Sequence, residues 1–145
     1  MKKKKVIAII MSLMLLFVFP IQANATMVAE QTINPRYQNM TSCVSAIKNN
    51  NGTLTATGTV STNKTCVVKI KLTVQWSTSS SNTGSWYDYK TFSTKTFSSG
   101  NPRVASATVD SVISNRWYRT VAEIEVIANG ISEKTTAISD PVRIN

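Results

Sequence analysis

The sequence predicts an all-β protein, a two-sheet sandwich of about seven antiparallel strands that follows a cleaved signal peptide. Three observations predict this fold class. Apolar and polar residues alternate with period two, turn-forming segments separate the alternating runs at intervals typical of short strands, and no helical periodicity follows the first 25 residues. A chain of 145 residues is long enough to form one such domain with a sizeable core.

The N-terminus has the three-part layout of a secretory signal peptide. Lysines occupy positions 2–5, an uncharged apolar run covers residues 6–19, and Ala23-Asn24-Ala25 matches the small-residue pattern that signal peptidase cuts. The alternative is a membrane anchor, but a helix over residues 6–19 spans only about 21 Å, less than the roughly 30 Å of the hydrocarbon core. We therefore expect cleavage after Ala25, no transmembrane anchor in the mature form, and a protein secreted to the extracellular space or the cell surface.

Three segments follow from this cleavage: a signal peptide at 1–25, an extended leader at 26–40 and the sandwich domain at 41–145. Removal of the four N-terminal lysines lowers the formal net charge from +9 to +5. The remaining basic residues form no block of five, so we expect no nucleic-acid partner. The mild positive charge fits either an ordinary soluble surface or attraction to acidic envelope polymers and anionic lipid headgroups.

Alternation identifies the strands and the side chains that face the core. The expected strands are residues 41–48, 53–60, 65–76, 86–97, 103–112, 116–128 and 131–139. The side chains predicted to share inward faces are Leu54, Ala56, Gly58 and Val60 in one strand, Cys66, Val68, Ile70, Leu72, Val74 and Trp76 in the next, and Tyr118, Ala122, Ile124 and Val126 in a late one.

Two Asn-Gly dipeptides predict hairpin turns, because asparagine and glycine tolerate the positive φ that both central positions of a type I′ turn require. For the first dipeptide, at 51–52, we expect Lys48 opposite Thr53. The second joins the last two expected strands and would place Glu125 opposite Lys134, an opposite-charge pair across the strands.

The only two cysteines of the chain, Cys43 and Cys66, both fall on inward faces, and the expected first hairpin places Cys43 beside Gly58. If their strands lay in one sheet, two strands apart, the separation would be about 9–10 Å, beyond the roughly 4.4–6.8 Å that a disulfide allows between Cα atoms. We therefore predict that the chain changes sheet near residues 61–64 and that a disulfide joins the cysteines across the core, as an oxidising compartment favours. Two free buried thiols are the alternative, which a host with inefficient disulfide formation would favour.

Four segments in order, NPRY, NNNGTLTATGTV, WYDYKTF and RWYRTVAEIEVIANG, resemble a family of small exported proteins of Gram-positive bacteria that has no assigned activity. They cover most of the chain after the signal peptide. The resemblance implies a secreted β-sandwich and no particular chemistry; usual members have a shorter first hairpin loop than KNNNG, and their cysteines vary. The immunoglobulin-like architecture is a second analogy, at the level of the fold alone, in which Tyr118 stands where a tyrosine corner would be.

Catalytic chemistry is difficult to build from this sequence. The chain has no histidine, the commonest general base and metal ligand, and it has no G-x-S-x-G, zinc, calcium or phosphate-loop motif. Glu123 and Glu125 share a strand face and could form a paired-carboxylate site, but a solvated face is the favoured interpretation. We expect no enzyme, no cofactor and no metal, and a small hydrolase is the poorest of the function classes considered.

Aromatic residues are the most specific surface feature, and Trp86, Tyr87, Tyr89 and Trp117 form the candidate ligand surface. The alternative is that these rings fill the core. Neighbouring side chains on a strand point to opposite faces, so at least one of Trp86 and Tyr87 should face outward. The predicted function is a secreted, non-catalytic binding module whose partner is an envelope polymer, a glycan or another surface protein. The alternative function is a secreted cationic bacteriocin-like or membrane-active toxin.

Overall fold

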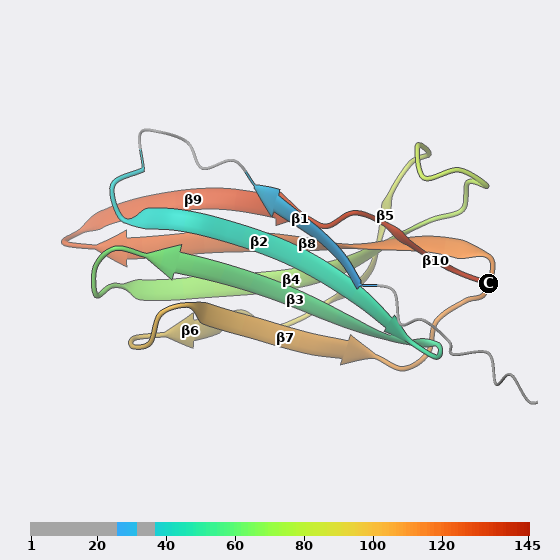
Figure 1. Cartoon of the computed structure of the whole chain (residues 1–145), viewed down its shortest axis with the longest axis horizontal. Helices are drawn as coiled ribbons and strands as arrows, with labels where there is room; N and C mark the ends of the chain where they lie inside the picture. Colours follow the sequence, from blue (N-terminus) through green and yellow to red (C-terminus); the bar gives the residue numbers. More distant parts are fainter. Residues whose placement is uncertain (1–25, 32–36) are drawn as a thin grey trace, which may run out of the picture.

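The computed structural model describes residues 26–31 and 37–145, so the predicted signal peptide lies outside the described residues. Two antiparallel sheets pack face to face (Figure 1). The four-stranded sheet has the order β1-β2-β3-β7 and is formed by β1 (Thr26–Gln31), β2 (Met40–Asn50), β3 (Thr53–Thr62) and β7 (Arg103–Val109). The six-stranded sheet is formed by β4 (Val67–Ser77), β5 (Tyr87–Thr91), β6 (Lys95–Phe97), β8 (Arg116–Ala128), β9 (Ile131–Ile138) and β10 (Val142–Ile144).

This architecture confirms the predicted fold class, an immunoglobulin-like two-sheet sandwich, and the described residues contain no helix. The structure has ten strands rather than about seven. The expected strand at 86–97 is split into β5 and β6, which pair with successive parts of β4. The strand β10 was not predicted; it follows Pro141, which cannot donate to a ladder, and it continues the pairing along β8. Thr26–Gln31, within the expected leader, form β1 against the edge of β2.

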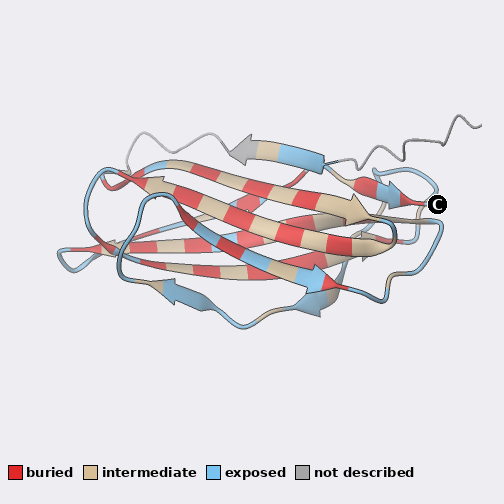
Figure 2. Cartoon of the chain, turned by 60° about the horizontal axis from the view of Figure 1, so that its bottom comes forward, coloured by how far each residue is buried: buried red, intermediate tan, exposed pale blue. Residues whose placement is uncertain are grey.

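The predicted inward faces are confirmed. Leu54, Ala56, Gly58 and Val60 are buried while the threonines between them are half-buried, and Figure 2 shows these alternating bands along the central strands. The inward residues of β4 and β8 are buried in the same way, apart from Trp76, which is partly buried against the core. The core of the described residues is formed by the facing sides of the two sheets.

The two sheets pack closely against each other at Gly58 of β3. A Cβ atom added there would lie 2.9 Å from Leu72 Cδ2, 3.0 Å from Ala122 Cβ and 3.1 Å from Ile70 Cγ2, all in the opposite sheet. Such distances are shorter than ordinary carbon–carbon contacts, about 3.5–4.0 Å. Glycine at this position therefore sets how closely the two sheets can pack.

Both Asn-Gly turns form hairpins with positive φ at both residues, as predicted. The expected register is confirmed for the second turn, where Glu125 lies opposite Lys134 and their charged groups are 3.4 Å apart. The first register was wrong by two residues, because the turn contains only residues 51–52 and Asn50 pairs with Thr53. A shift of two residues preserves the side-chain parity, so the predicted inward faces are unaffected.

The predicted change of sheet is confirmed, but the predicted disulfide is wrong. The chain leaves the four-stranded sheet at the end of β3 and enters the six-stranded sheet with β4. Cys43 and Cys66 are both buried, yet they are not bonded to each other. Across the core β4 contacts β3 and β7, whereas β2, which carries Cys43, contacts β8 and β9. Because of this offset, crossing between sheets does not bring the two thiols together; in addition, Cys43 pairs with Val60, not with Gly58.

Candidate binding surface

Tyr118 fixes the end of the sandwich where the candidate surface lies. Its ring is fully buried, its hydroxyl donates to the carbonyl of Ile113 at 3.2 Å, and it accepts from the Ile113 backbone N–H at 2.8 Å. Burial raises the pKa of the Tyr118 hydroxyl, so it is held protonated as a donor. These bonds to a residue five positions upstream have the form of a tyrosine corner, and they anchor the loop between β7 and β8.

Each of the three tryptophans of the chain has an arginine over its ring, and we call this cluster the Trp–Arg end. The pairs and the distances from guanidinium carbon to ring centroid are Trp86 with Arg119 at 4.3 Å, Trp76 with Arg116 at 5.8 Å, and Trp117 with Arg143 at 6.0 Å. They lie where β4 ends, β8 begins and β10 ends, at the right of Figure 1.

Arg119 belongs to the tightest pair and is held by a chain of polar side chains. Its Nε–H donates to Gln75 Oε1 at 2.9 Å, and Gln75 Nε2 donates to Asp88 Oδ1 at 2.9 Å. Gln75 stands opposite both Arg119 and Asp88 in the strand register, so the pairing of β4 with β8 and β5 brings these three side chains together. Partial burial lowers the pKa of Arg119, which still remains fully charged near neutral pH.

Trp117 is fixed from two sides. Its indole N–H donates to the carbonyl of Ser80 at 3.3 Å, in the hydroxyl-rich loop between β4 and β5. Arg143 lies opposite Trp117 in the register of β10 and β8. Arg143 also borders a polar depression of about 720 Å³, whose lining includes the Asn51-Gly52 turn and Asp110. This depression therefore offers space for several sugar rings of a ligand beside Trp117 and Arg143.

The two tyrosines of the predicted surface have different surroundings. Tyr87 is 56% exposed, in agreement with the expectation that at least one of Trp86 and Tyr87 faces outward. Tyr89 is partly buried between Trp76 and Tyr118, with ring centroids 5.9 and 5.5 Å away, and its hydroxyl donates to a backbone carbonyl. Tyr89 thus supports the surface from beneath.

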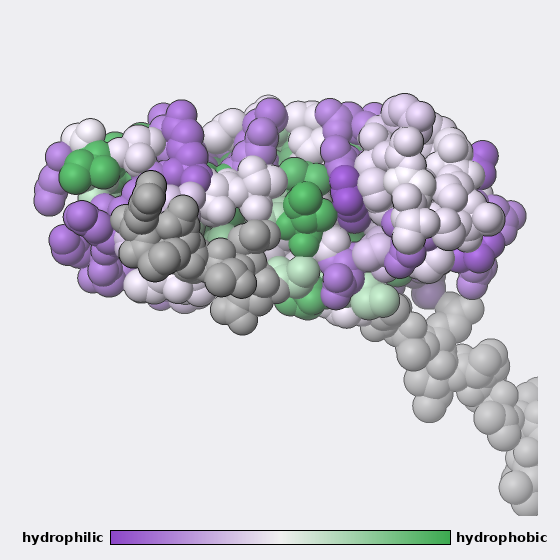
Figure 3. All heavy atoms as spheres, turned by 90° about the horizontal axis from the view of Figure 1, so that it is seen from above, coloured by the Kyte–Doolittle hydropathy of each residue, from purple (hydrophilic) through white to green (hydrophobic). Residues whose placement is uncertain are grey.

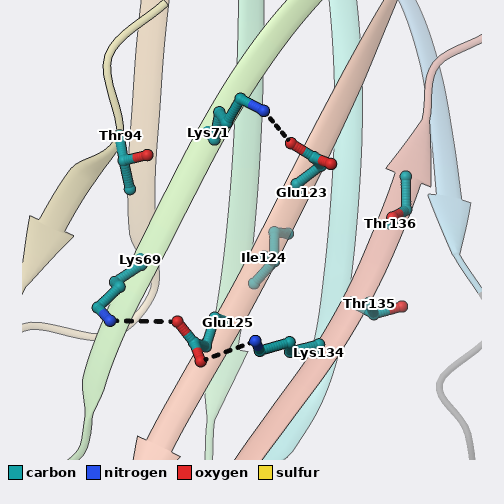
Figure 4. A pocket seen from close by; sticks show the side chains of 9 residues that line it. All are labelled: Lys69, Lys71, Thr94, Glu123, Ile124, Glu125, Lys134, Thr135 and Thr136. Atoms are coloured by element: carbon teal, nitrogen blue, oxygen red, sulfur yellow. Dashed lines mark hydrogen bonds and ion pairs between the residues drawn. The ribbon is translucent and has the colours of Figure 1, made fainter.

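A second candidate lies toward the other end of the same sheet face (Figure 4). Lys71 and Glu123 are 2.7 Å apart, and Glu125 bonds Lys69 at 3.2 Å and Lys134 at 3.4 Å, around a shallow depression of about 420 Å³. The Ser132 hydroxyl and Lys69 lower the pKa of Glu125. Glycoside hydrolysis by two carboxyl groups needs one with a raised pKa, and the shift here has the opposite sign. The paired lysines and glutamates therefore have the character of a solvated charge network.

The described residues contain no cluster of three or more metal-ligating side chains of His, Cys, Asp or Glu. Over the same part of the chain, no helix has the length and apolar composition needed to cross a membrane. No known family model matches the sequence, and no curated protein matches it at a significant level.

The sequence predictions missed the arginines of the Trp–Arg end. The motif RWYR, residues 116–119, already places two arginines beside aromatic residues on one strand. Of their partners, Trp76 lies on β4 and Trp86 directly precedes β5, and Arg143 is brought in only by the pairing of β10 with β8. A local signal for the arginines was therefore present, whereas the pairing depended on the tertiary fold.

Proposed function

We propose that this protein is a secreted, non-catalytic module that binds an anionic polymer of the bacterial cell envelope, a glycan carrying phosphate or carboxylate groups, through its Trp–Arg end. The observation that carries the proposal is the difference between its lysines and its arginines. All ion pairs of the described residues involve lysines, and Arg116, Arg119 and Arg143 form none of them. The positive charge of these three arginines is therefore not neutralised by an acidic side chain of the described domain.

The geometry of the pairs suits such a ligand. A guanidinium held over an indole has less freedom to rotate, and its planar donor fork matches phosphate and carboxylate oxygens. The exposed Tyr87 ring and the half-exposed indoles offer apolar faces on which sugar rings can stack. The net charge of +5 expected after cleavage adds long-range attraction to an acidic polymer.

The test is retention of residues 26–145 on purified anionic wall polymer and on insoluble neutral glycan, over a salt series. We expect retention on the anionic polymer that weakens steeply with salt. Arg119→Gln should weaken binding at least about tenfold, which corresponds to about 1.4 kcal/mol. Lys71→Gln is the matched control, because it removes the same charge from the same sheet face at an ion-paired position.

Three results would contradict the proposal: no retention on any polymer, equal losses for the two variants, or equal retention on neutral glycan. Release of dye from anionic vesicles without polymer binding would instead support the membrane-active toxin. N-terminal sequencing of the secreted protein should find Thr26 as the first residue, since secretion is a premise of the proposed function.

A further inference from the structure

Three of the four sheet edges carry features that block the addition of a foreign strand. At the edge formed by β7, Pro102 precedes the strand and the Lys95 amine donates to the Ser106 carbonyl at 2.8 Å. At the edge formed by β5 and β6, both strands are short and the register against β4 is bulged. Proline, lysine, bulges and short strands are the features that proteins use to protect exposed edges.

The edge formed by β9 is covered by the segment that leads into β2. The Tyr37 hydroxyl donates to the Lys134 carbonyl. The Glu133 carboxylate accepts backbone N–H groups of Gln38 at 2.7 Å and of Asn39 and Met40 at 3.0 Å. The break between β9 and β10 at Pro141 interrupts the rest of this edge.

The fourth edge, formed by β1, has none of these features. The strand contains no lysine, arginine or proline, and among residues 26–31 and 37–145 it pairs only with β2, at the end of the four-stranded sheet. Met27 is 37% and Val28 51% exposed. Figure 3 views the side of the molecule that carries β1 and shows hydrophobic atoms gathered near its middle, between hydrophilic bands. This edge is therefore open to strand addition, unlike the other three.

We propose that β1 is a self-association edge, at which two copies of the chain pair their β1 strands in antiparallel orientation about a two-fold axis. The four-stranded sheets would then join into one continuous sheet of eight strands. A two-fold contact uses the same surface on both copies, and antiparallel pairing of one strand with itself satisfies that requirement.

The charge and the register of β1 favour a second copy of this chain as the source of the strand that pairs with it. When the pairing is centred on Val28, this residue stands opposite Val28 of the second copy, Met27 opposite Ala29 and Thr26 opposite Glu30. Glu30 is the only charged residue of the strand, so no like charges face each other. The exposed Met27 and Val28 side chains would lose solvent contact in the pair. A contact of about five residues per strand is small, so the dimer should be weak, with a dissociation constant on the order of 10–1,000 μM.

The test is sedimentation of residues 26–145, with no polymer present, at concentrations from about 1 μM to about 1 mM, chosen to bracket that constant. We expect the weight-average mass to rise from that of a monomer toward twice that value. Val28→Lys should raise the dissociation constant at least about tenfold, because the two introduced lysines stand directly opposite each other across the pair. Val104→Lys is the matched control: Val104 is 48% exposed on β7, at the opposite edge of the same sheet.

Amide hydrogen exchange of the unsubstituted protein gives a second measurement that needs no variant. Exchange in β1 should slow as concentration rises, while exchange in β7 should not change. A monomer throughout the range, a dimer insensitive to Val28→Lys, or equal weakening by Val104→Lys would each overturn the proposal. Because no polymer is used, failure here leaves the proposed binding function standing, and failure of polymer binding leaves the dimer standing.

Discussion

Replacing Gly58 by alanine adds one methyl group where the two sheets pack closely against each other. The new carbon would meet Leu72 Cδ2 at 2.9 Å and Ala122 Cβ at 3.0 Å. The leucine carbon ends a flexible side chain and can move, whereas the alanine Cβ is fixed to the backbone of β8. Overpacking a core costs about 1–3 kcal/mol, and the loss of glycine's freedom in the unfolded chain offsets about 0.5–1 kcal/mol. We expect a net loss of about 1–2 kcal/mol in the free energy of unfolding.

The converse change, Ala122→Gly, removes the carbon that cannot move. It loses about 0.8 kcal/mol of methyl burial and about 0.5–1 kcal/mol through backbone freedom. If the two substitutions were independent, the double variant would lose roughly 3 kcal/mol. The added methyl of residue 58 instead occupies space that the methyl of residue 122 has vacated, so we expect a loss of only about 2 kcal/mol and a coupling energy of about 1 kcal/mol.

The coupling energy is measured by urea unfolding, followed by tryptophan fluorescence, of the original protein, the two single variants and the double variant. Leu72→Ala combined with Gly58→Ala provides a comparison, because removing a movable group should relieve less of the strain. Additivity of Gly58→Ala and Ala122→Gly within about 0.5 kcal/mol would refute the view that Gly58 sets the sheet spacing. A Gly58→Ala protein as stable as the original would refute it as well.

The remaining predictions concern buried polar groups and thiols. Tyr118→Phe should lower the free energy of unfolding by about 1–2 kcal/mol in urea, because the buried hydroxyl makes two backbone hydrogen bonds. Burial of Glu133 opposes its ionisation, but the backbone N–H groups that it accepts outweigh burial and lower its pKa. Its contribution to stability is thus present above the unfolded-state pKa of about 4.3 and is lost as pH falls through the lower folded-state value. Urea titrations should show a larger loss of stability at low pH in the original protein than in Glu133→Gln, in which the remaining loss comes from other carboxylates such as Glu125. Since Cys43 and Cys66 are not bonded to each other, a peptide map of the unreduced chain should contain no Cys43–Cys66 crosslink, and finding that crosslink would contradict the structure.

The inward faces could be predicted from sequence because each depends only on local alternation. Leu54, Val60 and Tyr118 are buried for the same reason that their neighbours are not: side chains of a strand alternate between faces. The Glu125–Lys134 pair was predictable because a two-residue Asn-Gly turn fixes the register of the strands that it joins.

Relations between distant strands could not be predicted in this way. Alternation predicts that Cys43 and Cys66 face the core. Whether their thiols meet depends on the lateral offset of the two sheets, and this offset keeps them from bonding to each other. Glu133 is a second example: alternation gives its inward direction, yet its partners lie 93–95 residues away in the chain. The arginine over each tryptophan likewise depends on which strands become neighbours.

Most residues of the Trp–Arg end lie on strands and not in loops, and this has a consequence for how such a protein can evolve. Along β8, Trp117 and Arg119 point outward, while Tyr118 and Thr120 point into the core. Residues that hold the fold and residues available to a ligand therefore alternate along the same strand and contact different surroundings. Substitutions at outward positions can accumulate without altering the packing of the inward ones, so descendants of this chain can acquire different ligands on an unchanged sandwich.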